Sequence, residues 1–334
     1  MQYSTFAAID IGSYDVILEI FEISKKQGIR SVDKICHRME LGKDTYTLGK
    51  IRPEMEEELC RVLADFVRIM EGYRVDDYRA TASSAISEAS NSLYVLGKIH
   101  QLTGLSVTVL SNSEQRFLSY KALAAMEDNF NKIIEKGTAI LDLDGGSFQI
   151  SLFDKDTLVS TQNLRLGVLR LQELLNHLNA GSTQMERLVD ELATAQLDDY
   201  KKLYLKDREI KNIIIVDDYL SPWAVRKAHE RGEVNAVVDR KAFSQLMEAL
   251  RTKGTTELAK RMDIAEEKVP LVYISAILTR RIAELMGAEL VWAPGVTLCD
   301  GIAYEYAEQN KMFRGEHDFC LLYTSPSPRD GATS

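Results

Sequence analysis

Residues 138–150 read TAILDLDGGSFQI, and this segment decides the fold of the chain. Its apolar opening, rich in β-branched residues, predicts a buried strand. Asp142 and Asp144 follow at the strand end, then comes Gly-Gly-Ser, and residues 148–153 predict a second strand. The simpler interpretation is a β-hairpin whose tight turn needs glycine. The alternative is a phosphate site, because glycines let backbone N–H groups approach phosphate oxygens while carboxylates hold a divalent metal.

A second copy of this pattern near the N-terminus favours the phosphate site. Residues 5–11 predict a strand that carries Asp10, and Gly12 and Ser13 form the turn after it. The segment that follows alternates apolar and polar residues, as a partly exposed antiparallel strand does. Each copy is followed by a further predicted strand, so the chain contains a repeated unit of one hairpin plus one strand. Such a repeat indicates an internal duplication.

Predicted helices alternate with short predicted strands along the rest of the chain. The helices cover residues 54–72, 87–103, 111–129, 167–178, 183–203, most of 218–286 and 299–310. The strands cover residues 78–82, 105–110, 213–216 and 289–292. This alternation, together with the two hairpin units, predicts two α/β domains that face each other across a cleft. We place the first at residues 1–135 and the second at residues 136–312.

Composition and net charge exclude some classes of function. The chain has 334 residues, enough for two full cores, and a net charge of −9, which argues against a general nucleic-acid binder. A bound Mg²⁺ could still admit a polyanionic substrate. The four cysteines show no metal-ligand spacing, and neither a leader peptide nor a membrane-spanning run is visible. We therefore expect a cytoplasmic protein with no nucleic-acid and no membrane partner.

The last residues depart from this pattern. Residues 320–334, CLLYTSPSPRDGATS, replace helical periodicity by Pro and Ser, and we interpret them as a non-native tail. Residues 313–319 are interpreted as the start of a missing C-terminal region. Neither segment enters the prediction of the fold.

Six motifs occur in order along the chain: AIDIGS at 8–13, SSAISEASN at 83–91, LSNSEQRFLSYKA at 110–122, LDLDGGSFQISLFD at 141–154, LGVLRL at 166–171 and PGVTLCDGIAYEYA at 294–307. Together they resemble the exopolyphosphatase and guanosine pentaphosphate phosphohydrolase family (Ppx/GppA). The resemblance implies two actin-like, ribonuclease-H-like α/β domains with the active site in the cleft between them. It also implies release of terminal phosphate from polyphosphate or guanosine pentaphosphate by activated water with Mg²⁺ (or Mn²⁺). It is compatible with a homodimer.

The resemblance also assigns site residues. Metal ligands are implied at Asp10 and Asp142, with Asp144 as an added carboxylate on the same face. Phosphate contacts are implied at Gly12, Ser13, Gly145, Gly146, Ser147 and Arg170. For Arg170 a surface salt bridge is the alternative. Asp217-Asp218 ends another predicted strand, but the glycine-rich sequence typical of a nucleotide-base pocket is missing there, so no such pocket is predicted.

The sequence departs from the family pattern at the positions that carry the chemistry. The catalytic base of the family, a glutamate, aligns with Gln115, and the glutamate after the second glycine turn is Gln149. An amide can orient a water molecule but cannot accept its proton, which removes a step expected to contribute about 10²–10⁴ in rate. Either Glu114 or Asp144 takes over a catalytic role, or the chain binds phosphate without turnover. For Glu114, a favourable interaction with a helix dipole is the alternative role.

Overall fold

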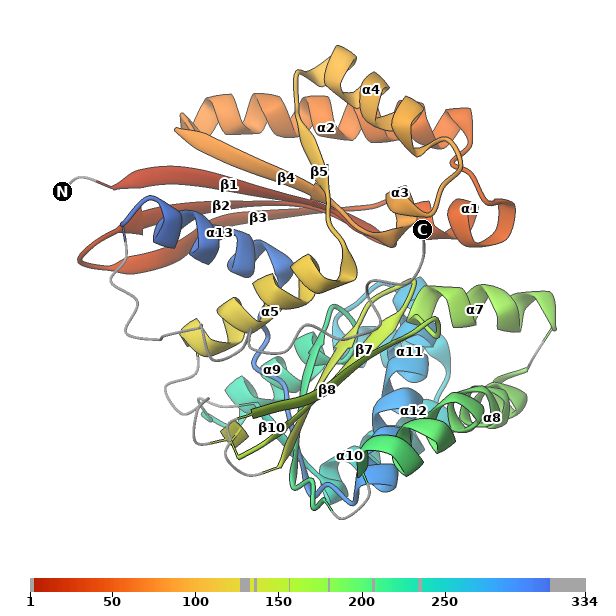
Figure 1. Ribbon diagram of the computed structural model, residues 1–334. Coiled ribbons are helices and arrows are strands. Elements are labelled where there is room, and N and C mark those ends of the chain that lie inside the picture. Colours follow the sequence, from red (N-terminus) through yellow and green to blue (C-terminus); the bar gives the residue numbers. More distant parts are fainter. Residues whose placement is uncertain are drawn as a thin grey trace.

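The computed structural model describes residues 3–126, 133–134, 137–155, 157–179, 181–205, 208–233 and 236–312. The predicted tail at 320–334, the segment at 313–319 and the end of the helix predicted at 111–129 lie partly or wholly outside these residues. The described chain forms two α/β lobes, one above the other in Figure 1, each built on one sheet. A two-domain α/β fold is therefore confirmed.

The first lobe contains a five-stranded sheet in the order β3-β2-β1-β4-β5. Its strands are β1 (Ser4–Ile11), β2 (Asp15–Ser24), β3 (Gly28–Arg38), β4 (Asp77–Ala82) and β5 (Val107–Val109). Its helices are α1 (Leu41–Leu48), α2 (Pro53–Tyr73), α3 (Ser84–Ser87) and α4 (Ser92–Thr103). Helix α5 (Asn112–Met126) then leads toward the second lobe.

The second lobe contains a six-stranded sheet in the order β10-β11-β9-β6-β7-β8. Its strands are β6 (Thr138–Leu143), β7 (Phe148–Asp154), β8 (Thr157–Leu164), β9 (Asn212–Asp217), β10 (Val237–Asp239) and β11 (Leu290–Trp292). Its helical segments are α7 (Val168–His177), α8 (Ser182–Tyr200), the π-helix η1 (Lys201–Leu205), α9 (Ser221–Glu230), α10 (Arg240–Thr252), α11 (Thr255–Met262), the 3₁₀-helix η2 (Glu266–Lys268) and α12 (Val269–Met286). The final helix is α13 (Leu298–Gln309).

The two sheets share one topology, which confirms the internal duplication. In the first lobe β1 pairs antiparallel with β2 and parallel with β4, while β2 pairs with β3. In the second lobe β6 pairs antiparallel with β7 and parallel with β9, while β7 pairs with β8. The order β3-β2-β1-β4-β5 therefore corresponds to β8-β7-β6-β9-β11, and β10 is an addition at the edge.

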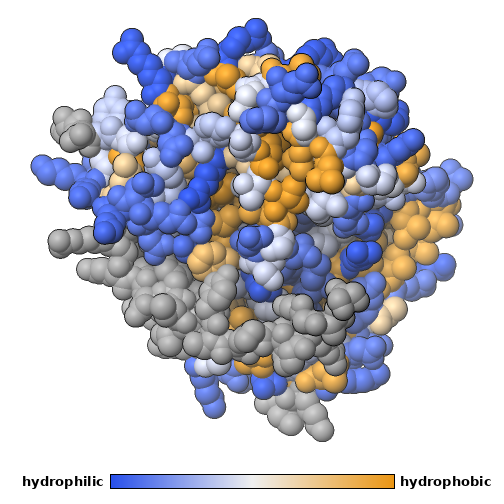
Figure 2. Space-filling model, turned by 45° about the horizontal axis from the view of Figure 1, so that its top comes forward, coloured by the Kyte–Doolittle hydropathy of each residue, from blue (hydrophilic) through white to orange (hydrophobic). Residues whose placement is uncertain are grey.

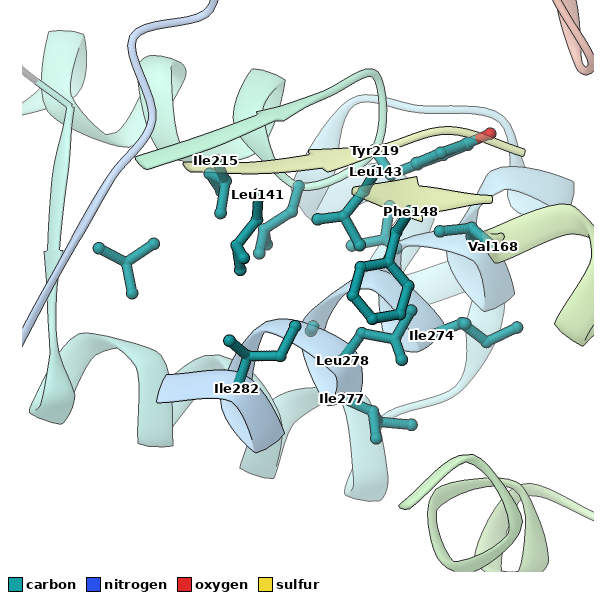
Figure 3. Packing of buried hydrophobic residues seen from close by; sticks show 14 of the residues in the cluster. Leu141, Leu143, Phe148, Val168, Ile215, Tyr219, Ile274, Ile277, Leu278 and Ile282 are labelled. Atoms are coloured by element: carbon teal, nitrogen blue, oxygen red, sulfur yellow. The ribbon is translucent and has the colours of Figure 1, made fainter. Parts of the chain in front are cut away.

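Strand alternation places the acidic residues at the cleft. Leu141 and Leu143 of β6 point into the core of the second lobe, where Figure 3 shows them facing Ile274, Ile277 and Leu278 of α12. Successive side chains of a strand point to opposite faces. Asp142 must therefore point to the other face, where Ser119 of α5 donates a hydrogen bond to its carboxylate. In β1, the same alternation buries Ile9 and Ile11 under α2 and turns Asp10 the other way.

Helices α5 and α13 lie between the two sheets in Figure 1. One small core joins α13 to the first sheet through Phe6, Ile302 and Tyr306, with Phe6 and Tyr306 stacked at 4.0 Å between ring centroids. Another joins α5 to the second sheet through Tyr120 and Phe153. The division at residues 135/136 remains a prediction, and α13, from the second range, packs on the first lobe.

Three local predictions were wrong. The helix predicted at 87–103 begins only at Ser92, as α4, and the short α3 before it ends at Ser87. Between them the Asn91 side chain hydrogen-bonds the backbone of Ile51 at 2.8 and 3.0 Å and competes with helix formation. Helix α1 was not predicted. It begins directly after Glu40, whose left-handed backbone (φ of 51°) turns the chain away from the preceding strand β3. Strand β10 lies inside the stretch predicted as mainly helical, because its three residues pair antiparallel with β11.

One face of the molecule can be compared with the polar surface expected of a folded domain. Figure 2 shows a face that is largely hydrophilic, with apolar side chains gathered in its middle. No helix in the described part of the chain combines the length and the apolar character needed to cross a membrane.

Asp217 is a structural residue at the end of β9. Its buried carboxylate accepts hydrogen bonds from the backbone N–H groups of Leu220 and Ser221 at the start of α9 and from the Ser275 hydroxyl of α12 at 2.6 Å. The next residue, Asp218, is solvent-exposed. Asp217 therefore connects β9, α9 and α12 of the second lobe. Asp218 makes none of these contacts and lines the cavity between the lobes.

Replacing Asp217 by Ala leaves these buried donors without an acceptor, so we expect the free energy of unfolding to fall by about 3 kcal/mol. Asp218→Ala is the matched control and should change it by no more than about 0.5 kcal/mol. Urea denaturation followed by circular dichroism measures both. Equal effects of the two substitutions would show that Asp217 has no special structural role.

Candidate active site

The two glycine-containing turns have the same hydrogen-bond pattern. In the first turn, residues 12–15, the Gly12 N–H donates to the Asp15 carbonyl at 3.0 Å. In the second turn, residues 144–147, the Asp144 N–H donates to the Ser147 carbonyl at 3.0 Å. The strand registers extend the match, since Ile11 pairs with Val16 and Leu143 with Phe148. Asp10 therefore corresponds to Asp142, and Gly12 corresponds to Asp144.

The turns approach each other so closely that side chains are excluded. A Cβ added to Gly145 would lie 2.6 Å from the Ser13 Cβ, and one added to Gly146 would lie 2.3 Å from the Tyr46 hydroxyl oxygen. Gly167, at the start of α7, packs against the second turn: its Cβ would lie 2.2 Å from the Gly146 carbonyl carbon. Real Cβ atoms do not reach such distances, so all three positions require glycine while the lobes are in this arrangement.

One acidic cavity lies between the lobes. It brings together several predicted site residues, namely Asp10, Gly12, Ser13, Gln115, Asp142 and Asp144. It adds residues that the sequence did not assign, among them Asp15, Ser83, Ser119, Asp218, Tyr219 and Thr297. The remaining predicted phosphate contacts, Gly145, Gly146, Ser147 and Arg170, lie in or beside the second turn rather than in the cavity wall.

Burial and the charges of neighbouring carboxylates raise the pKa values of three aspartates of this cavity. Burial, then the charges of Asp218 and Asp144, hold the pKa of Asp10 well above its usual value. Burial, with repulsion from Asp144, raises the pKa of Asp142 to about 7. Burial raises the pKa of Asp144 to about 6, although the Gly145 N–H opposes the shift. A proton or a cation is therefore needed to neutralise this group near neutral pH.

The three residues predicted around the missing base lie in different places. Gln115 lines the cavity from the first turn of α5. Glu114 is exposed outside it, and its carboxylate accepts hydrogen bonds from the Ser111 N–H at 2.8 Å and the Ser111 hydroxyl at 2.7 Å. Gln149 is buried in β7 and its amide donates to the Asn112 carbonyl at 3.3 Å. Glu114 thus caps α5, Gln149 supports the start of the same helix, and only Gln115 reaches the cavity.

A polar network closes one side of the two turns. The Tyr46 hydroxyl shares hydrogen bonds of 2.7 Å with the Ser13 hydroxyl and 2.8 Å with the Ser84 hydroxyl. Burial raises the pKa of Tyr46, so its phenol stays protonated. The Arg170 guanidinium lies 4.2 Å from the centre of the Tyr46 ring, forms an ion pair with Glu88 at 2.8 Å and donates to the Gly146 carbonyl at 2.9 Å. Arg170 therefore makes a salt bridge between the lobes.

The cavity fits a divalent cation held by few protein ligands. The Asp10 Oδ1 atom is buried without a hydrogen-bond partner among the described residues. Asp142 lines the same cavity with a raised pKa. In the described ranges, no three His, Cys, Asp or Glu side chains are grouped closely enough to bind a metal ion by themselves. Mg²⁺ commonly binds one or two carboxylates and completes its shell with water and phosphate oxygens, and this donor set suits that mode.

Some of the site residues that were not predicted lie in motifs that could have indicated them, and others do not. Ser83, Ser119 and Gly167 lie inside motifs that carry the family resemblance, at SSAISEASN, LSNSEQRFLSYKA and LGVLRL. Asp218 stands at a predicted strand end. The sequence gave no indication of Tyr46, because Tyr46 lies in a helix that was not predicted and reaches Ser13 and Ser84 through the tertiary packing of α1.

Two facing lobes with duplicated acidic glycine turns define a two-domain α/β protein with an acidic cavity between the lobes. The Ppx/GppA phosphatase family model matches residues 19–310. The chain belongs to this family.

Curated relatives match part of the chain. The bifunctional 3-dehydroquinate synthase/phosphatase of Fusobacterium nucleatum subsp. nucleatum is 22% identical over 210 residues, 59% of this chain and 31% of the relative. Exopolyphosphatase 1 of Mycobacterium leprae is 25% identical over 144 residues, 43% of this chain and 41% of the relative. The chain thus spans less than half the length of these relatives.

Solved structures match nearly the whole chain. A Ppx/GppA family member from Aquifex aeolicus has a TM-score of 0.74 at 17% identity, covering 95% of this chain and 100% of that one. An exopolyphosphatase from Cytophaga hutchinsonii has a TM-score of 0.76 at 18% identity, covering 93% and 100%. At these identities the likeness establishes the fold.

Gly167→Ala should displace the second turn, because its Cβ has no room. We expect a loss of about 1–3 kcal/mol in the free energy of unfolding from this overpacking. Gly181→Ala is the matched control: Gly181 also precedes a helix, with φ of −67° against −65° for Gly167, and nothing lies within 4 Å of its added Cβ. Thermal denaturation compares the two. A similar loss in both variants would contradict the proposed contact.

The raised pKa values of Asp142 and Asp144 predict a pH effect with a defined sign. Both carboxyls keep their protons longer in the folded than in the unfolded chain, so their contribution to stability is complete below about pH 4 and declines as the pH rises toward 6 and 7. Asp142→Asn should flatten this decline between pH 4 and 7. Added Mg²⁺ should stabilise the wild type more at pH 8 than at pH 5. Chemical denaturation at each pH measures both effects, and parallel wild-type and variant profiles would contradict the assignment.

Proposed function

We propose that the chain binds the terminal phosphates of inorganic polyphosphate or guanosine pentaphosphate between its lobes and releases the last phosphate by hydrolysis. The observation that carries the proposal is the pair of matching turns that meet at the wall of a cavity containing Asp10 and Asp142. Family membership and the described fold support the same reaction class.

The residues of the cavity suit a polyanion only together with a cation. Asp10 and Asp142 would hold Mg²⁺ (or Mn²⁺), which neutralises charge on the phosphoryl oxygens when bound. We assign the Ser13 hydroxyl, which lines the cavity, and the backbone N–H groups of the adjoining glycine turns as the donors to such a ligand. Ser119 holds the Asp142 carboxylate in place through its hydrogen bond of 3.2 Å.

Hydrolysis requires a water oxygen to bond to the terminal phosphorus while the bridging P–O bond breaks and the shortened chain leaves with the bonding electrons. The water must also lose a proton. Gln115 is the residue of the first α5 turn that lines the cavity, and its amide oxygen can accept a hydrogen bond from that water. It cannot take the proton, so a hydrolase built on this site runs without a positioned base and is slow.

The same observation favours a second candidate, a protein that binds polyphosphate or a phosphorylated nucleotide without turnover. Glutamine has the shape of glutamate but no charge, so Gln115 maintains the hydrogen bonds of the site while removing the base. Glu114 does not compensate, because its carboxylate caps α5 outside the cavity. Binding with little or no hydrolysis is therefore the alternative to a slow enzyme.

Gln115→Glu restores a carboxylate where the family has its base, and we expect it to raise phosphate release by about 10²–10⁴. The measurement is phosphate released from polyphosphate and from guanosine pentaphosphate with Mg²⁺, beside the melting temperature with each ligand. Asp142→Ala serves as the inactive control.

A slow hydrolase gives wild-type release above this control. A binding protein gives ligand-dependent stabilisation with release only in Gln115→Glu. If neither ligand changes the melting temperature and neither protein exceeds Asp142→Ala, both candidate functions are wrong.

A further inference from the structure

Comparison of the two duplicated turns shows that the second turn has a side chain, that of Asp144, where the first turn has glycine. Asp144 corresponds to Gly12, as the matching hydrogen bonds and strand registers require. The first turn thus leaves the corresponding position without a side chain, and the second turn fills it with a carboxylate. The added carboxylate lies on the cavity wall, beside the donors that a phosphate would use.

The Asp144 carboxylate is bound to a donor of its own turn. Its Oδ1 atom accepts a hydrogen bond from the Gly145 N–H at 2.6 Å, and its Oδ2 atom accepts one from the Ser84 hydroxyl of the opposite lobe at 3.5 Å. Backbone N–H groups of a glycine turn are the groups that bind phosphate oxygens in such sites. The Gly145 N–H is therefore occupied by an anion that belongs to the chain.

The neighbouring donors are also engaged by protein groups. The Ser13 hydroxyl bonds Tyr46 at 2.7 Å. The Arg170 guanidinium bonds Glu88 and the Gly146 carbonyl. An incoming phosphate must exchange these contacts for its own. The Asp144 and Glu88 carboxylates carry the same sign of charge as the ligand, and of the two Asp144 lines the cavity.

We infer that Asp144 is an internal anion that occupies the phosphate position of the second turn, so that a phosphate ligand binds only by displacing its carboxylate from Gly145 and Ser84. The inference rests on the proposed function, because it supposes that the turns take phosphate. It assigns Asp144 to the control of affinity. A ligand that is held at both turns, such as tripolyphosphate, competes with this carboxylate better than a single phosphate does.

The test is calorimetric titration of the full chain with tripolyphosphate, with and without Mg²⁺. Asp144→Gly installs the residue found in the first turn, and Asp144→Asn leaves the side chain nearly the same size without its charge. Hydrogen bonds to charged groups are worth enough that releasing this one should raise affinity by about 10- to 100-fold in Asp144→Gly without Mg²⁺. Asp218→Asn is the matched control, because it removes another cavity charge that bonds to neither turn donor, and should raise affinity no more than about two-fold.

A second readout follows the donor itself. The amide proton resonance of Gly145 should move upfield in Asp144→Gly, and tripolyphosphate should move it back downfield. The inference is overturned if wild type binds tripolyphosphate and Asp144→Gly binds it no more tightly, or if Asp218→Asn gives the same gain; the proposed function then stands. If no variant binds tripolyphosphate under any condition, the proposed function and the inference fall together.

Discussion

The close approach of the two turns is the constraint on which the rest of the site depends. Gly145 lies against Ser13, Gly146 against Tyr46, and Gly167 against the backbone of the second turn, with no space for a Cβ at any of the three. This contact fixes the distance between the sheets at the place where Asp10 and Asp142 end up on facing strands. The lobes are joined again through α5 and α13, whose cores reach the second and first sheets. Two features thus fix the position of the site: the contact between the glycine turns, and the packing of α5 and α13 between the lobes.

Negative charge is the second constraint. Asp10, Asp142 and Asp144 share one cavity, and burial raises the pKa of each carboxyl. The Asp144 charge raises the pKa values of Asp10 and Asp142 further, so folding of this region is opposed by the ionisation of these groups. Positive side chains nearby are already engaged: Lys268 pairs with Asp15 at 2.7 Å and Arg170 with Glu88. The negative charge of the cavity is therefore not compensated by these side chains, and a bound cation would compensate it. A metal ion bound there would stabilise the fold and would also reduce the repulsion of a phosphate ligand.

Much of this arrangement could be predicted from the sequence, because it depends on local patterns. The hairpin repeat at 5–23 and 138–153 predicted the first two strands of each sheet. The alternation of Leu141, Asp142 and Leu143 predicted that the Asp142 carboxylate points to the face opposite the two leucines. What could not be predicted depends on contacts between distant segments. Tyr46 reaches the turns because α1 packs on both α3 and α7. Helix α13 follows the second lobe in sequence but packs on the sheet of the first lobe. The cap formed by Glu114 and the bond from Gln149 to Asn112 likewise depend on where α5 begins.

A glutamine at position 115, where the family resemblance implies a glutamate base, has a further electrostatic consequence. A glutamate at this position would face a cavity that already contains several aspartates, and a phosphate ligand would add to the repulsion. The neutral amide removes that charge while it still offers hydrogen bonds to a water molecule or a phosphoryl oxygen. Asp144 places a charge in the same cavity, but on the turn, where it is bonded to Gly145. Under the proposed function, a carboxylate is absent where it would accept a proton and present where it would compete with the ligand. This arrangement would favour control of phosphate binding over rapid hydrolysis.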